Sequence, residues 1–153
     1  MINLNVFSEE KAWSKKLKKK DFFFKSICDA FPKKYKFLNK KISLSLLLSN
    51  NKKIKILNKK FRNKNKHTDI LSFPFKDKKK KLKEIYLGDL IISYNYMSKP
   101  KNLSNYEFKK KTIKIFIHGF LHLLGYDHIK NKEYKEMLKE EQKVFKSVEK
   151  LLN

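Results

Sequence analysis

HGFLHLLGYDH, residues 118–128, contains three of the four histidines of this 153-residue chain. On a helix, His118 and His122 are four residues apart, so both imidazoles lie on one face within about 6 Å of each other. Gly125 can adopt the left-handed conformation that ends a helix and reverses the chain. His128 then returns towards the first two histidines. The stretch therefore predicts three nitrogen donors around an open fourth position, as in a catalytic zinc site.

The spacing of these residues matches the zinc motif of the metzincin proteases, H-E-x-x-H-x-x-G-x-x-H. In those enzymes a glutamate beside the first histidine takes a proton from the attacking water. Gly119 stands at that position and has no side chain. The motif therefore predicts a zincin-like metal helix. A zinc protease remains the weaker alternative, because the sequence offers only Asp127, beyond the turn, as a nearby carboxylate.

The apolar pattern extends this helix and predicts another after the turn. From Ser104 onward apolar residues recur at intervals of three and four, which predicts a long helix with one side in the core. Glu133 to Leu152 has the pattern of a closing amphipathic helix. Tyr94 to Asn102 has no clear period.

The first part of the chain alternates strand and helix patterns. Strands are predicted at Asn3–Phe7, Ile42–Leu48, Thr68–Phe73 and Glu84–Ser93. Helices are predicted from Ser8 to about Phe31 and from Asn51 to Phe61, with an exposed hairpin or crossover loop at residues 76–83. Without repeats or a linker, residues 1–153 are expected to form a single α+β domain. Its small, mostly four-stranded sheet would be backed by four to six helices.

The formal net charge of +24 would attract a polyanion such as nucleic acid. Lysine, asparagine, isoleucine and phenylalanine are all abundant, as A+T-rich codon drift would also produce, so the charge alone supports RNA binding weakly. Cys28 is the only cysteine, which fits a reducing compartment and a core position. The sequence has neither an apolar run of membrane-spanning length nor a signal-peptide pattern, so we expect a cytoplasmic protein.

Arg62 is the only arginine among 39 basic residues. Lysine can replace arginine as a diffuse charge, but not as a planar fork of donors to two phosphate oxygens. We therefore expect Arg62 to bind phosphate. The alternative is that a single arginine has remained in a loop by chance, without a function. His67 is predicted to be a surface residue. Asp127 could either favour the turn or orient a ligand imidazole or a water.

The sequence resembles the YbeY endoribonucleases, bacterial rRNA maturation factors with the signature H-G-x-L-H-L-x-G-Y-D-H. Every fixed position is present in residues 118–128. Upstream, Leu57-Asn58 and Arg62 are similar to the family's L-N-x-x-[YF]-R, followed by TDILSFP at residues 68–74 and LGDLIIS at residues 87–93. Asn63 and His67 stand where glycine and proline are usual, which affects the loop's conformation but removes no expected ligand.

The resemblance implies a metal-dependent, single-strand-specific endoribonuclease that processes the 3′ end of 16S rRNA and acts in ribosome quality control. It implies one Zn²⁺ held by His118, His122 and His128 and a functional Arg62. Single-stranded RNA, rRNA and the small ribosomal subunit are the implied partners. A non-catalytic ribosome-binding factor with a structural zinc is the other alternative. The sequence leaves the oligomeric state open.

The expected mechanism answers the negative charge that builds up on a phosphodiester as it is cleaved. The metal would polarise a phosphoryl oxygen or activate a water, while Arg62 holds the scissile phosphate. With Gly119 in place of a glutamate, we expect an open pocket in which a bulky phosphate can approach the metal. Asp127 is the further catalytic candidate.

Overall fold

The computed structural model describes residues 1–76 and 84–153, so the predicted hairpin or crossover loop at 76–83 lies outside the described residues except for Lys76. The strands are β1 (Ile2–Ser8), β2 (Lys41–Ser49), β3 (Ile70–Pro74) and β4 (Glu84–Ser93). They form one sheet in the order β1-β2-β4-β3. The pairs β1–β2 and β2–β4 are parallel, and β3 is antiparallel to β4. All four predicted strands are therefore confirmed, within two residues at their ends.

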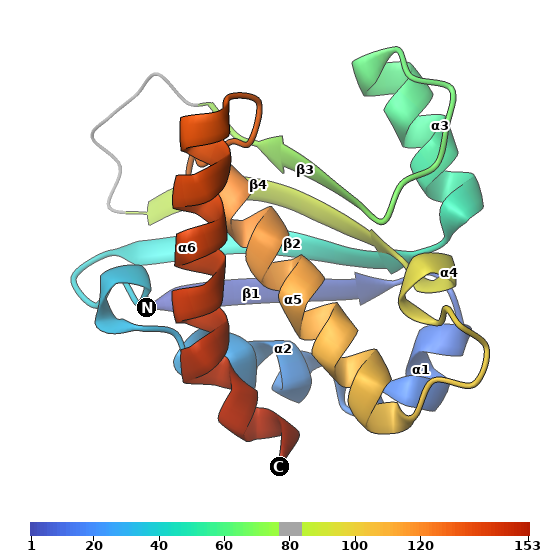
Figure 1. The fold of residues 1–153 in the computed structure, drawn as a ribbon, viewed down its shortest axis with the longest axis horizontal. Helices are drawn as coiled ribbons and strands as arrows, with labels where there is room; N and C mark the ends of the chain where they lie inside the picture. Colours follow the sequence, from blue (N-terminus) through green and yellow to red (C-terminus); the bar gives the residue numbers. More distant parts are fainter. Residues whose placement is uncertain (77–83) are drawn as a thin grey trace.

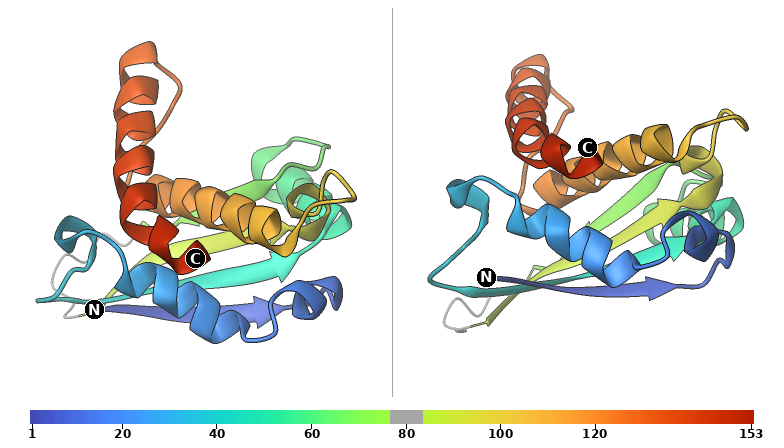
Figure 2. Two further views of the ribbon diagram at one scale, coloured as in Figure 1. Left: turned by 60° about the horizontal axis from the view of Figure 1, so that its bottom comes forward. Right: turned by 90° about the horizontal axis from the view of Figure 1, so that it is seen from below.

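Helices cover mainly one face of this sheet (Figure 1). Their bounds are α1 (Ala12–Lys16), α2 (Lys20–Asp29), α3 (Asn51–Arg62), α4 (Tyr94–Met97), α5 (Asn105–Leu123) and α6 (Asn131–Val148), with 3₁₀ turns at η1 (Lys33–Tyr35) and η2 (Glu149–Leu152). In Figure 2, α2 and α5 lie against the sheet and α6 lies on the outer side of α5. The arrangement confirms the predicted α+β class. None of the described helices is long and apolar enough to cross a membrane.

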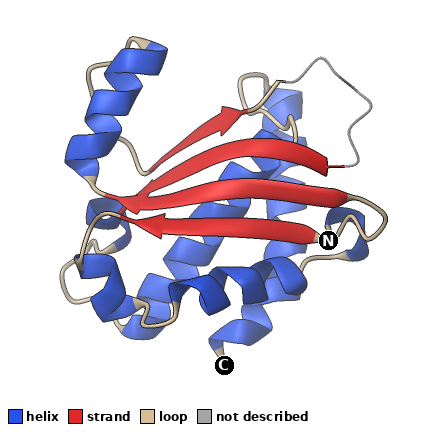
Figure 3. Cartoon of the chain, turned by 180° about the vertical axis from the view of Figure 1, so that it is seen from behind, coloured by secondary structure: helices blue, strands red, loops and turns tan. Residues whose placement is uncertain are grey.

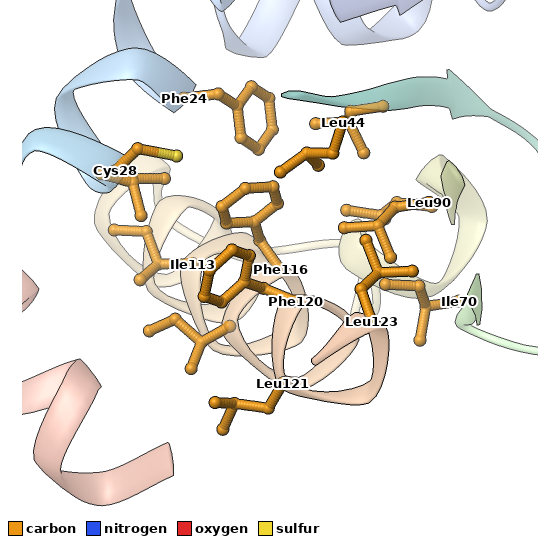
Figure 4. Packing of buried hydrophobic residues seen from close by; sticks show 14 of the residues in the cluster. Phe24, Cys28, Leu44, Ile70, Leu90, Ile113, Phe116, Phe120, Leu121 and Leu123 are labelled. Atoms are coloured by element: carbon orange, nitrogen blue, oxygen red, sulfur yellow. The ribbon is translucent and has the colours of Figure 1, made fainter. Parts of the chain in front are cut away.

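The main core lies between the sheet and α5 (Figure 4). Alternate residues of β2 point towards the helices, and Leu44 and Leu46 are fully buried there. Phe116 and Phe120 of α5 fill the space opposite, where Phe116 packs on Phe24 with ring centroids 5.3 Å apart. Each such side chain contributes about 1.5–3 kcal/mol through removal from water. This packing fixes α5, and with it the two histidines near its end, against β3 and β4.

The other face of the sheet is largely open in the described structure. Figure 3 shows β1 and β2 from this side without a covering helix. Only α3 contributes a small second cluster here, in which Ile54 packs with Leu71 and Ile91. The amphipathic α3 is thus held at the β3–β4 side, and its last residue, Arg62, comes to the β3 side of the molecule.

The single helix predicted from Ser8 to Phe31 is wrong, because the chain forms two helices with a break at Leu17 and Lys19. These residues have φ, ψ of −124°, 87° and −121°, 69°. Trp13 is held at the end of β2, where its Nε1 donates a 2.9 Å hydrogen bond to the Ser49 carbonyl oxygen. Its ring also packs on Phe108, 5.7 Å between centroids. The apolar residues keep helical spacing across the break, so the periodicity gave no sign of this tertiary anchor.

Candidate metal centre

The histidines at the end of α5 face each other. His118 Nε2 and His122 Nε2 are 3.1 Å apart, and their ring centroids are separated by 4.6 Å. Ser104 accepts a hydrogen bond from the Glu107 backbone N–H and caps the helix at its predicted start. The four-residue spacing then places both imidazoles on the same side of α5, as predicted.

The turn after α5 brings the third histidine back to the first two. Gly125 has a φ of +101°, the left-handed region that favours glycine. The His128 ring lies 4.9 Å from that of His122 and 5.6 Å from that of His118. One nitrogen from each ring falls within a group whose members are all within 4.8 Å of one another. The structure thus brings together the three predicted ligands in a group that could hold a metal ion.

Hydrogen bonds fix which nitrogens of the two helix histidines face the centre. His118 Nδ1 lies 2.6 Å from Glu141 Oε1, and His122 Nδ1 lies 2.8 Å from the Tyr126 carbonyl oxygen. Both partners are acceptors, so each Nδ1 carries the proton and each Nε2 presents a lone pair. Two lone pairs at 3.1 Å repel each other unless a cation lies between them. Two nitrogen ligands of a tetrahedral zinc lie about 3.4 Å apart, so the donor set fits a zinc ion.

The protonation state of His122 also suits a metal ligand. Burial lowers its pKa from the ordinary value, and the neighbouring His118 ring lowers it further. The neutral imidazole therefore persists to lower pH than in a free histidine. Neutral histidine is the form that binds a metal.

Glu141 is the site residue that the sequence analysis missed. It lies on α6, thirteen positions after His128, and its contact with His118 arises only from the packing of α6 on α5. A signal was present, since Glu141 places a carboxylate on the same helix face as the buried Met137 and Val144. Its carboxylate also corrects the view that Asp127 is the only acid nearby. Glu141 contacts Nδ1, whereas Nε2 of the same ring faces His122, so Glu141 is placed to orient His118 and does not take the position of the missing protease glutamate.

Glu141→Gln is expected to weaken metal binding by about 10- to 100-fold, because an uncharged amide holds the His118 N–H less strongly and makes the ring a poorer ligand. Competitive titration with a chromogenic chelator measures this change. Glu136→Gln is the matched control, since Glu136 is an exposed carboxylate on the same helix. Equal metal affinity in the two variants would show that Glu141 does not support the site.

Packing against the sheet explains why residue 119 is glycine. It is buried, and a Cβ built there would lie 2.5 Å from Ile70 Cδ1 and 2.9 Å from Leu90 Cδ2. The position therefore faces the sheet, and glycine allows α5 to approach β3 and β4 closely. A side chain there would also meet Ser72, which like Ile70 lines the cleft over the histidines, so room for phosphate at the metal stays a prediction.

Gly119→Ala is expected to lower the free energy of unfolding by up to about 2 kcal/mol. Overpacking a core usually costs about 1–3 kcal/mol, and the higher helix propensity of alanine returns about 1 kcal/mol of it. Urea denaturation followed by circular dichroism measures it. Lys139→Ala, at an exposed position of α6, should change the value by no more than about 0.5 kcal/mol. A stability gain in Gly119→Ala would mean that α5 does not sit this close to the sheet.

A cleft of about 630 Å³ opens over the histidines. Its lining includes the three histidines, Arg62 and Asp127, together with Lys64, Lys76, Thr68 and Ser72. Two clusters far apart in the sequence, the end of α3 and the turn after α5, thus meet at one concave surface. Asp69 also lines it, so three basic side chains stand beside two carboxylates, and the small formal excess of positive charge would favour an anionic substrate.

Local structure places Arg62 on this cleft. The Asn50 side chain accepts a hydrogen bond from the Lys53 backbone N–H and caps α3 at its start. Asn63 ends the helix in the left-handed conformation, with φ 54°. Asparagine tolerates this region better than other non-glycine residues, so the departure from the usual glycine preserves the turn. Arg62 is exposed and is one of the residues that line the cleft.

The other candidate residues take different positions. Asp127 Oδ1 accepts a 2.7 Å hydrogen bond from the His128 backbone N–H, the contact expected of a turn-forming aspartate. Its carboxylate makes no hydrogen bond to an imidazole in the described structure, although it lines the cleft. His67 is exposed, and its Nδ1 lies 2.9 Å from the Tyr96 hydroxyl, outside the histidine group.

A polar cluster behind the turn holds Tyr126 in place. The Tyr126 hydroxyl lies 3.1 Å from that of Tyr35, which in turn donates to Glu140 on α6. Burial, followed by these hydrogen bonds, raises the pKa of Tyr35, and the bond from Tyr35 lowers the pKa of Glu140. Because the Tyr126 carbonyl accepts the His122 N–H, this cluster supports the orientation of the His122 ring.

The chain is similar to known proteins over most of its length. The family model described as Endoribonuclease YbeY matches residues 6–149. Endoribonuclease YbeY of Pelagibacter ubique is 62% identical over 148 residues, which cover 97% of each chain. The protein of the same name from Persephonella marina is 36% identical over 70% of this chain and 71% of its own. The solution structure of TM1509 from Thermotoga maritima superposes with a TM-score of 0.58 at 26% identity, over 95% of this chain and 89% of that one.

Proposed function

Because the chain belongs to the YbeY endoribonuclease family, we propose that it is a zinc-dependent endoribonuclease that cleaves single-stranded RNA. We place it in processing of the 16S rRNA 3′ end and in ribosome quality control, with the small ribosomal subunit as a partner in the cytoplasm. The observation that carries the proposal is the group of three histidine nitrogens within 4.8 Å, in the same cleft as Arg62. The whole of residues 1–153 would act as one catalytic domain.

His118, His122 and His128 would hold one zinc ion. When bound, that ion would supply a Lewis acid to a phosphoryl oxygen or to the attacking group. Glu141 and the Tyr126 carbonyl keep the protons of His118 and His122 on Nδ1, so both Nε2 atoms remain available as donors. Glu141 lies on α6 and His118 on α5, so the orientation of the His118 ring would depend on the packing of these two helices.

Arg62 would bind the scissile phosphate. Cleavage adds negative charge to the non-bridging oxygens, and a guanidinium can donate to two of them at once. Lys64 and Lys76 on the same cleft would hold neighbouring phosphates as point charges, without reading sequence. Asp127 would shape the turn and keep a carboxylate beside the cleft, where it could orient a water.

The geometry favours this function over the two alternatives. A structural zinc has four protein ligands and no open position, whereas the group found among the described residues has three and lies in a cleft. A zinc protease needs a carboxylate at the attacking water, and Glu141 contacts the far nitrogen of His118. The histidine group therefore supports a nuclease with an accessible metal better than either alternative.

The proposal is tested by incubating the purified protein with labelled single-stranded RNA, the matching duplex and casein. We expect cleavage of the single strand alone, its loss on treatment with a chelator, and its return when zinc is added back. Cleavage that survives the chelator would point to a contaminating ribonuclease. Binding to small ribosomal subunits without any cleavage would instead support the non-catalytic factor.

A further inference from the structure

A second basic concavity lies away from the histidines. This lysine groove, of about 700 Å³, is formed where α1 ends, α2 begins and α5 starts, and it is lined by Lys15, Lys16, Lys18, Lys19, Lys109 and Phe22 among others. In Figure 1, α1 and α2 lie beside the first half of α5, whereas the histidine turn follows its other end. Lys109 and His122 are thirteen residues apart on α5, which corresponds to about 20 Å along the helix.

The charge in this groove has one sign. The described residues that line it include five lysines and no carboxylate. Lys15, Lys18 and Lys19 are exposed and form no ion pair with another described residue. Nearby Asp21 pairs with Lys20, outside the groove. Lysines brought together around a concave surface favour a partner that carries closely spaced negative charges.

An aromatic side chain stands in the same groove. Phe22 is 70% exposed, unlike Phe24 two residues later, which is fully buried in the core. Phe23 packs against Phe24 with ring centroids 5.1 Å apart, but Phe22 has no aromatic partner among the described residues. The break between α1 and α2 explains the arrangement, since it gathers four lysines at one bend and leaves the Phe22 ring facing solvent beside them.

We propose that the lysine groove is a second binding surface for single-stranded RNA, separate from the metal centre. Lysines that follow a phosphate backbone and an exposed ring on which a base can stack are together the features that bind single strands without sequence preference. An acidic protein segment would use the lysines but gives Phe22 no comparable role. The inference deepens the proposed function and rests on it, because a nuclease for single strands would hold the strand beyond the bond that it cleaves.

The charge is tested by replacing Lys15, Lys18 and Lys19 with glutamine. The matched control replaces Lys135, Lys139 and Lys146, three exposed lysines of α6, so both variants lose three positive charges. Binding of a fluorescent single strand of about 20 nucleotides is measured by anisotropy at several salt concentrations, with chelator present to prevent cleavage. We expect the groove variant to bind on the order of tenfold more weakly, with the slope of log K against log salt concentration smaller in magnitude by about 2. The control should change little. Equal weakening in the two variants would overturn the inference.

The ring is tested by Phe22→Ala, with Phe7→Ala as control because Phe7 is 59% exposed on β1. Phe22→Ala should weaken binding of the single strand on the order of tenfold and leave binding of the duplex unchanged, since paired bases cannot stack on the ring. An equal effect on both RNAs, or none on either, would contradict the stacking role.

Cleavage assays separate this inference from the proposed function. With long RNA, the groove variant should show a raised KM and an unchanged kcat, whereas RNA of about four nucleotides, which reaches only the cleft, should be cleaved as by the wild type. If the wild-type protein cleaves neither RNA, the proposed nuclease fails and the binding result still stands. If the groove variant matches the control variant throughout, the groove fails and the nuclease stands.

Discussion

His122→Ala is expected to bind zinc more than 100-fold more weakly than the wild type and to cleave single-stranded RNA at no more than the background rate. Loss of a ligand imidazole should exceed the 10- to 100-fold effect of losing an outer partner such as Glu141. The fold should survive, because the variant removes one half-buried ring and one hydrogen bond, to the Tyr126 carbonyl. Elemental analysis, circular dichroism and the cleavage assay measure the three properties on one preparation.

His67→Ala is the control for this variant, since His67 is exposed and lies outside the histidine group. It should retain zinc and cleavage. If His122→Ala keeps both the metal and the activity, the three-histidine site is wrong, whatever the family resemblance. If it keeps the metal but loses cleavage, His122 would act on the substrate and not as a ligand.

Arg62→Lys is expected to reduce kcat by about 10²- to 10³-fold while the zinc content stays at the wild-type value. The loss is that of a donor directed at the charge that develops during cleavage, because an ammonium cannot hold two phosphate oxygens in one plane. Arg62 is exposed at the end of α3, so the substitution should leave stability within about 0.5 kcal/mol of the wild type. Single-turnover cleavage with excess enzyme measures the change.

Lys64→Gln provides the comparison for Arg62→Lys. Lys64 lines the same cleft, and loss of one point charge should weaken RNA binding and its salt dependence while kcat changes little. Full activity in Arg62→Lys would remove the phosphate clamp from the mechanism. Equal loss in both variants would mean that Arg62 contributes only general positive charge.

The meeting of the three histidines could be predicted from the sequence because it depends on local geometry. A spacing of four on a helix and a glycine at the turn are sufficient to bring His118, His122 and His128 together. Strand β4 was also predicted with its observed bounds, Glu84–Ser93. Positions fixed by short-range geometry thus follow from one stretch of chain.

Features that depend on contacts between distant segments could not be predicted in this way. The break at Leu17 is caused by the anchoring of Trp13 at Ser49, 36 residues away. The contact of Glu141 with His118 follows from the packing of α6 on α5. The need for glycine at position 119 follows from the close approach of α5 to Ile70 and Leu90. In each case the pattern of apolar residues is compatible with more than one local structure, and tertiary packing selects among them.

Asn63 shows an intermediate case. Because asparagine stands where glycine is usual, and asparagine can adopt either a helical or a left-handed conformation, the sequence does not determine the conformation of the loop after Arg62. The structure places it in the left-handed region at the end of α3. Arg62 therefore reaches the cleft by the same kind of helix ending that a glycine would provide.

Zinc stoichiometry combined with X-ray absorption spectroscopy, on the protein purified without added metal, decides whether three imidazoles hold one metal ion. We expect one zinc per chain, with histidine scattering at about 2.0–2.1 Å and no sulfur ligand. A folded protein that carries no metal and takes up none when zinc is supplied would contradict it.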